Sequence, residues 1–191
     1  MDEKDRKILS LLRENPEIRQ REIARLIGIS QPSVGARIKK LKERGLISYV
    51  VGTNLKKVGL YLSKVEITAK KTNEILNSFK NCPYFLNGFV TSGKYNLCLF
   101  FVSEDISTLE ALVDAHIRPR PNVMEVKMSL ILSMVNDFIF PLKFEFERKE
   151  TPPCNYSGSC GACEYYNAGR CLGCPVTGFY RGKIWSEVKG K

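Results

Sequence analysis

The sequence predicts an α+β protein built from a winged helix-turn-helix domain, a ferredoxin-like βαββαβ domain and a small metal-binding tail. Three observations predict it. Residues 1–52 are basic and helical in pattern, strand-like and helix-like stretches alternate over residues 53–136, and five of the seven cysteines lie in residues 154–191. Residues 137–153 are expected to be a linker, which ends in Thr-Pro-Pro because proline breaks regular structure.

The composition is typical of a globular protein, with an excess of positive charge. The chain is 43% hydrophobic and 26% charged, and its formal net charge is +10. This charge favours nucleic acid as a partner, although a lysine-rich solvated surface gives the same balance. No apolar run is long enough to span a bilayer, and the start MDEKDRK lacks the apolar core of a signal peptide. We therefore expect a cytoplasmic protein, in which cysteines serve metal or redox chemistry before structural disulfides.

Three helices are expected in the first domain. The first begins near Asp2 or Asp5 and ends at Asn15, because the residue before a proline disfavours helix. The second covers residues 21–27 and closes at Gly28, and the third starts at Ser30 as its N-cap and stops at Gly45. Apolar residues at helical spacing give the inward faces: Ile8, Leu9, Leu11 and Leu12, then Ile23, Leu26 and Ile27, then Val34, Ile38 and Leu41.

The third helix leaves a polar, basic face exposed. Ser33, Arg37 and Lys40 share that face, away from the buried stripe. Two short helices, a glycine turn and a capped third helix form the unit that reads DNA, in which the start of the recognition helix reaches base edges. A three-helix bundle with a basic solvated face has the same pattern. The residues that we expect to contact DNA are Ser30, Gln31, Ser33, Ala36, Arg37 and Lys40.

At this point the sequence resembles a known family. The stretch DRKILSLLRENPEIRQREIARLIGISQPSVGARIKKLKERGLI is similar to the N-terminal domain of the leucine-responsive/asparagine-operon (Lrp/AsnC) regulators. The family pattern of an acidic start, ILxxL, ELAxxxGxS and VxxRxxxLxxxGxI is met almost throughout. Ile23 replaces the usual Leu, and Gln20 stands where Ser or Thr often caps the helix.

The second domain shows strands and helices in the ferredoxin-like order. One face of such a sheet packs on two helices, so the other face needs cover, and a second copy of the chain is the simplest cover. A homodimer is therefore expected, with assembly into a higher oligomer as a further expectation. The predicted elements are strand 60–68, helix 72–79, strand 84–91, strand 95–102, a helix from Asp105 or Ser107 to Ala115, and strand 123–133.

This domain resembles the family's regulatory domain, which dimerises and binds small effectors near the turn between the second and third strands. The resemblance places Ser92, Gly93 and Asn96 at that effector site, and Gly93 matches the family glycine. Asn96 stands where the family usually has Asp, so the α-ammonium of an amino acid loses its ion-pair partner. Outside this turn, the single histidine, His116, is interpreted as a surface or capping residue, and Cys82 and Cys98 as small apolar residues.

The tail carries a strong metal signal. Two C-x2-C pairs are separated by seven residues, with Gly161 and Gly173 inside their turns. Three chemistries fit: an iron–sulfur cluster of the 4Fe-4S kind, which we favour slightly; one structural zinc ion held by the last four cysteines; and disulfides. The candidate ligands are Cys154, Cys160, Cys163, Cys171 and Cys174.

The sequence as a whole indicates a sequence-specific transcriptional regulator that binds double-stranded DNA, with its metal or redox state as an input. No Gly-rich phosphate loop, paired carboxylates or nucleophile–base set is present, which indicates that the chain is not an enzyme. The alternatives are an iron–sulfur electron-transfer subunit that binds no DNA, and an adaptor whose basic face binds an acidic protein.

Overall fold

The computed structural model describes residues 1–154 and 158–186 and divides into two compact units, Met1–Val50 and Val51–Lys191. The tail, predicted to be a separate part, belongs to the second unit together with the ferredoxin-like domain. Among the described residues, no helix combines the length and the apolar character needed to cross a membrane.

The first unit consists of α1 (Glu3–Glu14), α2 (Gln20–Ile27) and α3 (Gln31–Glu43). Asp2 caps α1 in a reciprocal pair with Asp5, and the Ser30 side chain accepts a bond from the Ser33 amide at the start of α3. Gly28 ends α2 with φ at 67°, a left-handed conformation that glycine adopts without strain. The structure describes every residue of this unit, and it contains no strand, so the predicted wing is not formed.

The core of the first unit confirms the predicted stripe of α3 and, for α1, Ile8, Leu11 and Leu12 but not Leu9, and it corrects the stripe of α2. Leu26 was expected to turn inward, yet it is 54% exposed, and Ala24 is buried instead. On a helix Ala24 and Leu26 lie on opposite sides of Ile23, so only one of them can join Ile23 in the core. The buried set is Ile8, Leu12, Ile23, Ala24, Val34, Ile38 and Leu41.

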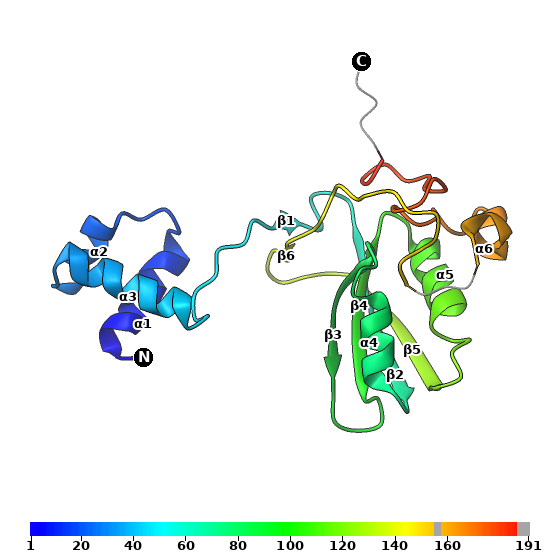
Figure 1. Ribbon diagram of the computed structural model, residues 1–191, viewed down its shortest axis with the longest axis horizontal. Helices are drawn as coiled ribbons and strands as arrows, with labels where there is room; N and C mark the ends of the chain where they lie inside the picture. The colour runs from blue at the N-terminus through cyan, green and yellow to red at the C-terminus, as the bar shows by residue number, and fades with distance from the viewer. Residues whose placement is uncertain (155–157, 187–191) are drawn as a thin grey trace, which may run out of the picture. The chain divides into compact units, whose positions relative to one another are not determined.

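The second unit is built on an antiparallel four-stranded sheet with the ferredoxin-like order β3-β4-β2-β5 (Figure 1). The predicted order of elements is confirmed, with small shifts at the ends. A separate two-stranded ribbon pairs β1 (Thr53–Asn54) with β6 (Ile139–Phe140). The elements of the main fold are β2 (Tyr61–Ala69), α4 (Thr72–Phe79), β3 (Phe85–Val90), β4 (Leu97–Ser103), α5 (Ile106–His116) and β5 (Val123–Ile131).

The two faces of the sheet are covered differently. One face packs on α4 and α5, and alternate residues such as Val65 and Leu99 are fully buried there. On the opposite face Val102 is buried, whereas Phe100 is half-exposed and Phe89 is 49% exposed. Phe89 and Phe100 meet edge to face, with ring centroids 6.1 Å apart. This part of the second face is an apolar surface without cover from the described residues of the chain.

The connector and the tail complete the core of the second unit. Phe140 and Leu142 of the predicted linker pack against that core, and Trp185 and Cys154 of the tail are buried in it. The Trp185 indole donates to the Lys143 carbonyl at 3.0 Å. Within the tail, η1 (Cys160–Ala162) and α6 (Glu164–Asn167) form two short helical turns, and α6 lies beside α5 in Figure 1. A tail of this size has little core of its own, so it shares that of the domain.

Candidate nucleic-acid interface and thiol-lined cavity

The α3 helix presents most of the predicted DNA-contacting residues to solvent. Its buried stripe of Val34, Ile38 and Leu41 fixes which side is exposed. Because the missing N–H of Pro32 falls in the first turn, the helix starts without loss of a backbone bond. The exposed residues on this side are Ser30, Gln31, Ser33, Ala36 and Lys40.

Arg37 differs from its neighbours and corrects the prediction that its side chain is free. Its Nη1 donates to Asp2 Oδ2 at 2.6 Å and to Asp5 Oδ1 at 2.7 Å. Only 32% of the Arg37 side chain is exposed. The guanidinium therefore ties α3 to the N-terminal cap of α1. The sequence shows the acidic residues at the start of α1 and the arginine of α3, but it does not indicate that their side chains are hydrogen-bonded.

This contact helps to lower the pKa of both carboxyl groups. The Asp5 amide lowers the pKa of the Asp2 carboxyl, and Arg37 lowers it further; for Asp5 the Asp2 amide and then Arg37 act in the same direction. A carboxyl whose pKa is lowered by folding stabilises the fold above its unfolded pKa, near 4, and loses that contribution as the pH falls through its folded pKa. The contact between α1 and α3 is thus weakened by acid.

The turn between β3 and β4 holds the three residues predicted to bind an effector. Gly93 has φ at 100°, and Ser92 and Gly93 are exposed. Asn96 faces inward, where its side-chain oxygen accepts from the Ala69 amide at 2.9 Å and its side-chain nitrogen donates to the Ala69 carbonyl at 2.7 Å. The Asn96 amide is therefore engaged in closing the end of β2.

The tail and the domain enclose a cavity lined by sulfur. It leaves about 40 Å³ for the centre of a water-sized sphere, roughly three times what one water molecule needs. Pro152, Tyr166 and Leu112 close it with apolar surface. Six thiols and one imidazole line it, those of Cys82, Cys154, Cys160, Cys163, Cys171, Cys174 and His116.

Two of these groups come from the domain and were not predicted to belong to a site. His116, at the end of α5, was interpreted as a surface or capping residue, yet its Nδ1 lies 3.2 Å from Cys154 Sγ. Burial, with a smaller effect of Arg120, lowers the pKa of His116 to about 4, so the imidazole is neutral. Cys82, interpreted as a small apolar residue, is buried and lines the same cavity. Nothing in the local sequence of either residue indicates the tail that covers them.

Burial in the cavity raises the pKa of two of the thiols in the C-x2-C pairs. Burial raises the pKa of Cys171 to about 11, with a small opposing effect of the Gly173 amide and a further increase from Cys160 and Cys163. Burial also raises the pKa of Cys174 to about 12. In residues 1–154 and 158–186, no group of three or more His, Cys, Asp or Glu side chains is arranged to hold one metal ion. No disulfide joins any of the seven cysteines, all of which lie among the described residues.

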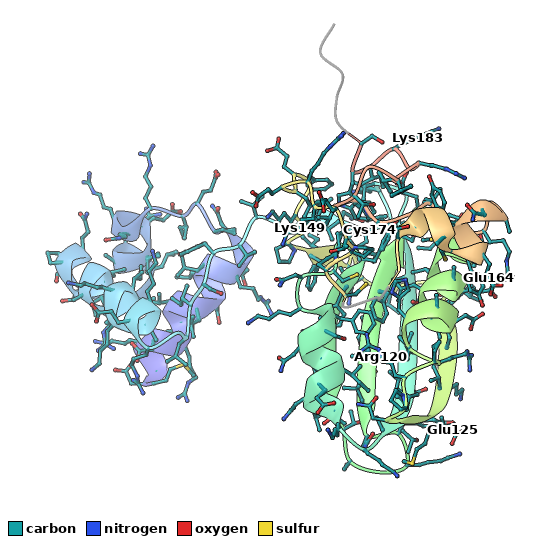
Figure 2. All side chains as sticks on the ribbon, turned by 45° about the vertical axis from the view of Figure 1, so that its right-hand side comes forward. Arg120, Glu125, Lys149, Glu164, Cys174 and Lys183 are labelled. Atoms are coloured by element: carbon teal, nitrogen blue, oxygen red, sulfur yellow. The ribbon has the colours of Figure 1, made fainter. Side chains whose placement is uncertain are left out.

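Hydrogen bonds fasten the tail to the domain around this cavity. The Tyr84 hydroxyl donates to the Gly173 carbonyl, and the Leu172 amide donates to Thr108 Oγ1 on α5 at 2.9 Å. Glu104 accepts from the Lys183 amide at 2.8 Å. Figure 2 shows Cys174 where the tail crosses the end of the sheet, with Lys183 beyond it.

Known proteins resemble both the first unit and the sheet domain of this chain. The family model described as winged helix-turn-helix DNA-binding matches residues 1–48. The HTH-type transcriptional regulator Ptr1 of Methanocaldococcus jannaschii is 31% identical over 141 residues, which are 72% of this chain and 95% of the relative. The HTH-type transcriptional regulator LrpA of Pyrococcus abyssi is 28% identical over 136 residues, 69% of this chain and 96% of its own.

Solved structures show the same fold. AsnC of Escherichia coli matches with a TM-score of 0.65 at 20% identity, over 71% of this chain and 95% of its own. LrpC of Bacillus subtilis matches with a TM-score of 0.59 at 26% identity, over 71% of this chain and 97% of its own. These relatives are matched almost in full, whereas more than a quarter of this chain lies outside each match.

The contact between Arg37 and the α1 cap is testable through Asp5. We expect Asp5→Asn to lower the melting temperature of the first unit, and to flatten its decline below about pH 4, because one acceptor of Arg37 loses its charge. Affinity for duplex DNA, measured by fluorescence anisotropy, should fall, although removing a negative charge by itself raises affinity for a polyanion. Glu22→Gln, an exposed carboxylate on α2, is the matched control. A rise in affinity for Asp5→Asn alone would show that a released Arg37 contacts DNA.

Proposed function

The chain belongs to the Lrp/AsnC family of helix-turn-helix transcriptional regulators, and from this premise we propose how it contacts its operator, pairs with a second copy and binds metal. It is a sequence-specific DNA-binding protein. The observation that carries the contact proposal is the capped α3 helix, whose buried stripe leaves Ser33 and Lys40 exposed on one side and Gln31 exposed in the first turn.

These exposed residues divide by chemistry. Ser30, Gln31 and Ser33 lie at the N-terminal end of α3, the end from which a recognition helix reaches base edges in the major groove. Ala36 offers a methyl group for apolar contact with a thymine methyl. Lys40, one turn further on, reaches a phosphate as a point charge, which fixes register without reading sequence. Arg37 acts mainly by holding α3 against α1.

A second copy of the chain is the proposed cover for the open part of the sheet. Phe89 and Phe100 present an apolar pair there, beside the ion pair of Lys64 with Glu66 at 3.1 Å. A helix-turn-helix dimer binds two half-sites one helical turn apart, so pairing of the sheets supplies the second α3 that a palindromic operator needs. The proposal places this activity in the cytoplasm.

Two ligands complete the proposal. A small effector binds at the turn that holds Ser92, Gly93 and Asn96, beside a hollow of about 290 Å³ lined by Ser92 and the carboxylate of Glu66. The tail binds metal through its two C-x2-C pairs, as an iron–sulfur cluster in preference to one zinc ion, and its metal state sets operator affinity. What supports metal binding is the gathering of the five tail cysteines around one cavity.

The contact of α3 with DNA is tested on Lys40. With a duplex selected from a random pool by the wild-type protein, Lys40→Ala should weaken binding by a similar factor for all sequences. The slope of log affinity against log salt should fall by about one for each recognition helix, because one phosphate contact is lost. Lys56→Ala, an exposed lysine of the second unit, should leave both quantities unchanged. Equal slopes for wild type and Lys40→Ala would remove Lys40 from the interface.

Dimerisation through the open sheet face is tested with a buried charge. Phe100→Asp should convert the dimer to a monomer in size-exclusion chromatography with light scattering, because an unpaired carboxylate cannot be buried against a second sheet. Val135→Asp adds the same charge at a fully exposed position and should leave the dimer intact. An unchanged mass for Phe100→Asp, with an unchanged circular dichroism spectrum, would contradict this interface.

Metal binding is tested on full-length protein purified without oxygen. Iron, acid-labile sulfide and zinc are measured for the wild type, for a Cys160→Ser/Cys163→Ser variant and for Cys98→Ser. We expect metal in the wild type and in Cys98→Ser, and its loss when one C-x2-C pair is removed, since thiolates are the ligands. A wild type that takes up neither iron nor zinc would refute metal binding by the tail.

A further inference from the structure

The sulfur-lined cavity is not a feature of the tail alone. Four of its thiols lie in the loops of the two C-x2-C pairs, and Cys154 lies at the start of the tail. The remaining groups, Cys82 and His116, belong to the domain, where Cys82 follows α4 and His116 ends α5. The cavity therefore exists only while the tail lies on the domain.

The loops of the tail are shaped for this position. Gly173 has φ at 80°, and a Cβ at this residue would lie 2.5 Å from the Phe179 carbonyl oxygen. Glycine is therefore required between Cys171 and Cys174, and it lets the chain turn tightly enough to bring both sulfurs to the cavity. The Gly173 amide points at Cys171 Sγ, with 3.4 Å between nitrogen and sulfur, and its carbonyl accepts from Tyr84 of the domain. Amide bonds to sulfur stabilise a thiolate and tune a cluster that it holds.

The arrangement of the thiols favours a cluster over a single ion. A zinc ion needs four ligand atoms that converge on one point, within about 2.3 Å of it for sulfur. In the described part of the chain the side chains do not converge in this way but surround a void. A cluster presents several iron ions to separate thiolates, so its ligands stand around a volume. The apolar walls, which include Leu112 and Tyr166, keep water away from such a group.

We propose that this cavity is the binding site of an iron–sulfur cluster held by Cys160, Cys163, Cys171 and Cys174, and that the cluster fastens the tail to α5 of the regulatory domain. The inference rests on the metal binding proposed above and adds its place and its consequence. Cys82 and His116 form the wall on the domain side, and Cys154 of the tail lies against His116. They position and shield the cluster, whereas the four thiolates bind it.

The consequence concerns α5. Leu172, the residue after Cys171, donates a hydrogen bond from its amide to Thr108 Oγ1 on α5. This bond joins the loop that holds the cysteines to the helix. Asp105 caps the same helix through the amides of Ser107 and Thr108. Since a metal site that forms only in the folded arrangement adds its binding free energy to that arrangement, a bound cluster stabilises the docked tail and, through this bond, the first turn of α5.

The experiment compares full-length protein before and after loading with ferrous iron and sulfide without oxygen. Loading should give about four iron and four sulfide ions per chain, with the broad visible absorption of a cluster. Amide hydrogen exchange, followed by mass spectrometry, should then slow several-fold in Ile106–His116 as well as in residues 158–174. Cys82→Ala should load the same cluster but lose iron to a chelator several-fold faster than wild type, because the wall is opened. Cys98→Ala, a thiol outside the cavity, is the matched control and should behave as wild type.

Each other outcome overturns a defined part. Uptake of one zinc ion and no sulfide would overturn the cluster while leaving metal binding by the tail intact. A loaded cluster that slows exchange only in residues 158–174, with Cys82→Ala as stable as Cys98→Ala, would overturn the shared site but not the proposed function. Failure to take up any metal would overturn both. Operator binding and circular dichroism, measured on each variant, separate a lost site from a lost fold.

Discussion

A β-sheet with apolar residues on both faces is stable in water only when both faces are covered, and this requirement organises the second unit. α4 and α5 cover one face. On the other face Val102 is buried while Phe89 and Phe100 are not, so residues 1–154 and 158–186 cover only part of it. The tail adds Trp185 to the core of this unit, where its ring meets Tyr84 edge to face with ring centroids 5.6 Å apart. The packing that completes the core is also what brings the cysteines of the tail to α5.

In the first unit, the small size of the domain gives the contact of Arg37 its importance. A three-helix domain of about fifty residues buries only a small apolar core, so a polar contact between its helices is a larger share of its stabilising interactions. The guanidinium adds a directional contact between α3 and the capped end of α1, since it forms charge-assisted bonds to both Asp2 and Asp5. A basic side chain at the edge of a recognition helix is therefore used to position that helix, while Lys40 stays exposed beside it.

The sequence predicted what depends on local pattern, and it failed where contacts join distant residues. The start of α1 near Asp2 or Asp5, the cap at Ser30, the αL glycine at residue 28 and the βαββαβ order follow from neighbours in the chain, and all of them are confirmed. Whether the Arg37 side chain is free or bonded depends on Asp2 and Asp5, more than thirty positions away. His116 likewise meets Cys154 across 38 positions. The predicted helix ended at Ala115, so the sequence placed His116 only near the end of a helix and no local signal identifies its partner.

The β3 strand lies between the sulfur-lined cavity and the open face of the sheet. Tyr84, immediately before β3, donates to Gly173 at the cavity, and Phe89, near the other end of β3, belongs to the open face proposed to meet a second copy. A ligand shifts an equilibrium only by the difference in its affinity for two states. A cluster bound as proposed would have that difference, because only the docked tail completes the wall around the cavity. Coupling of metal binding to the proposed dimer would then need no contact between cluster and partner: it would require only that docking of the tail changes the position or the stability of β3, which borders both surfaces.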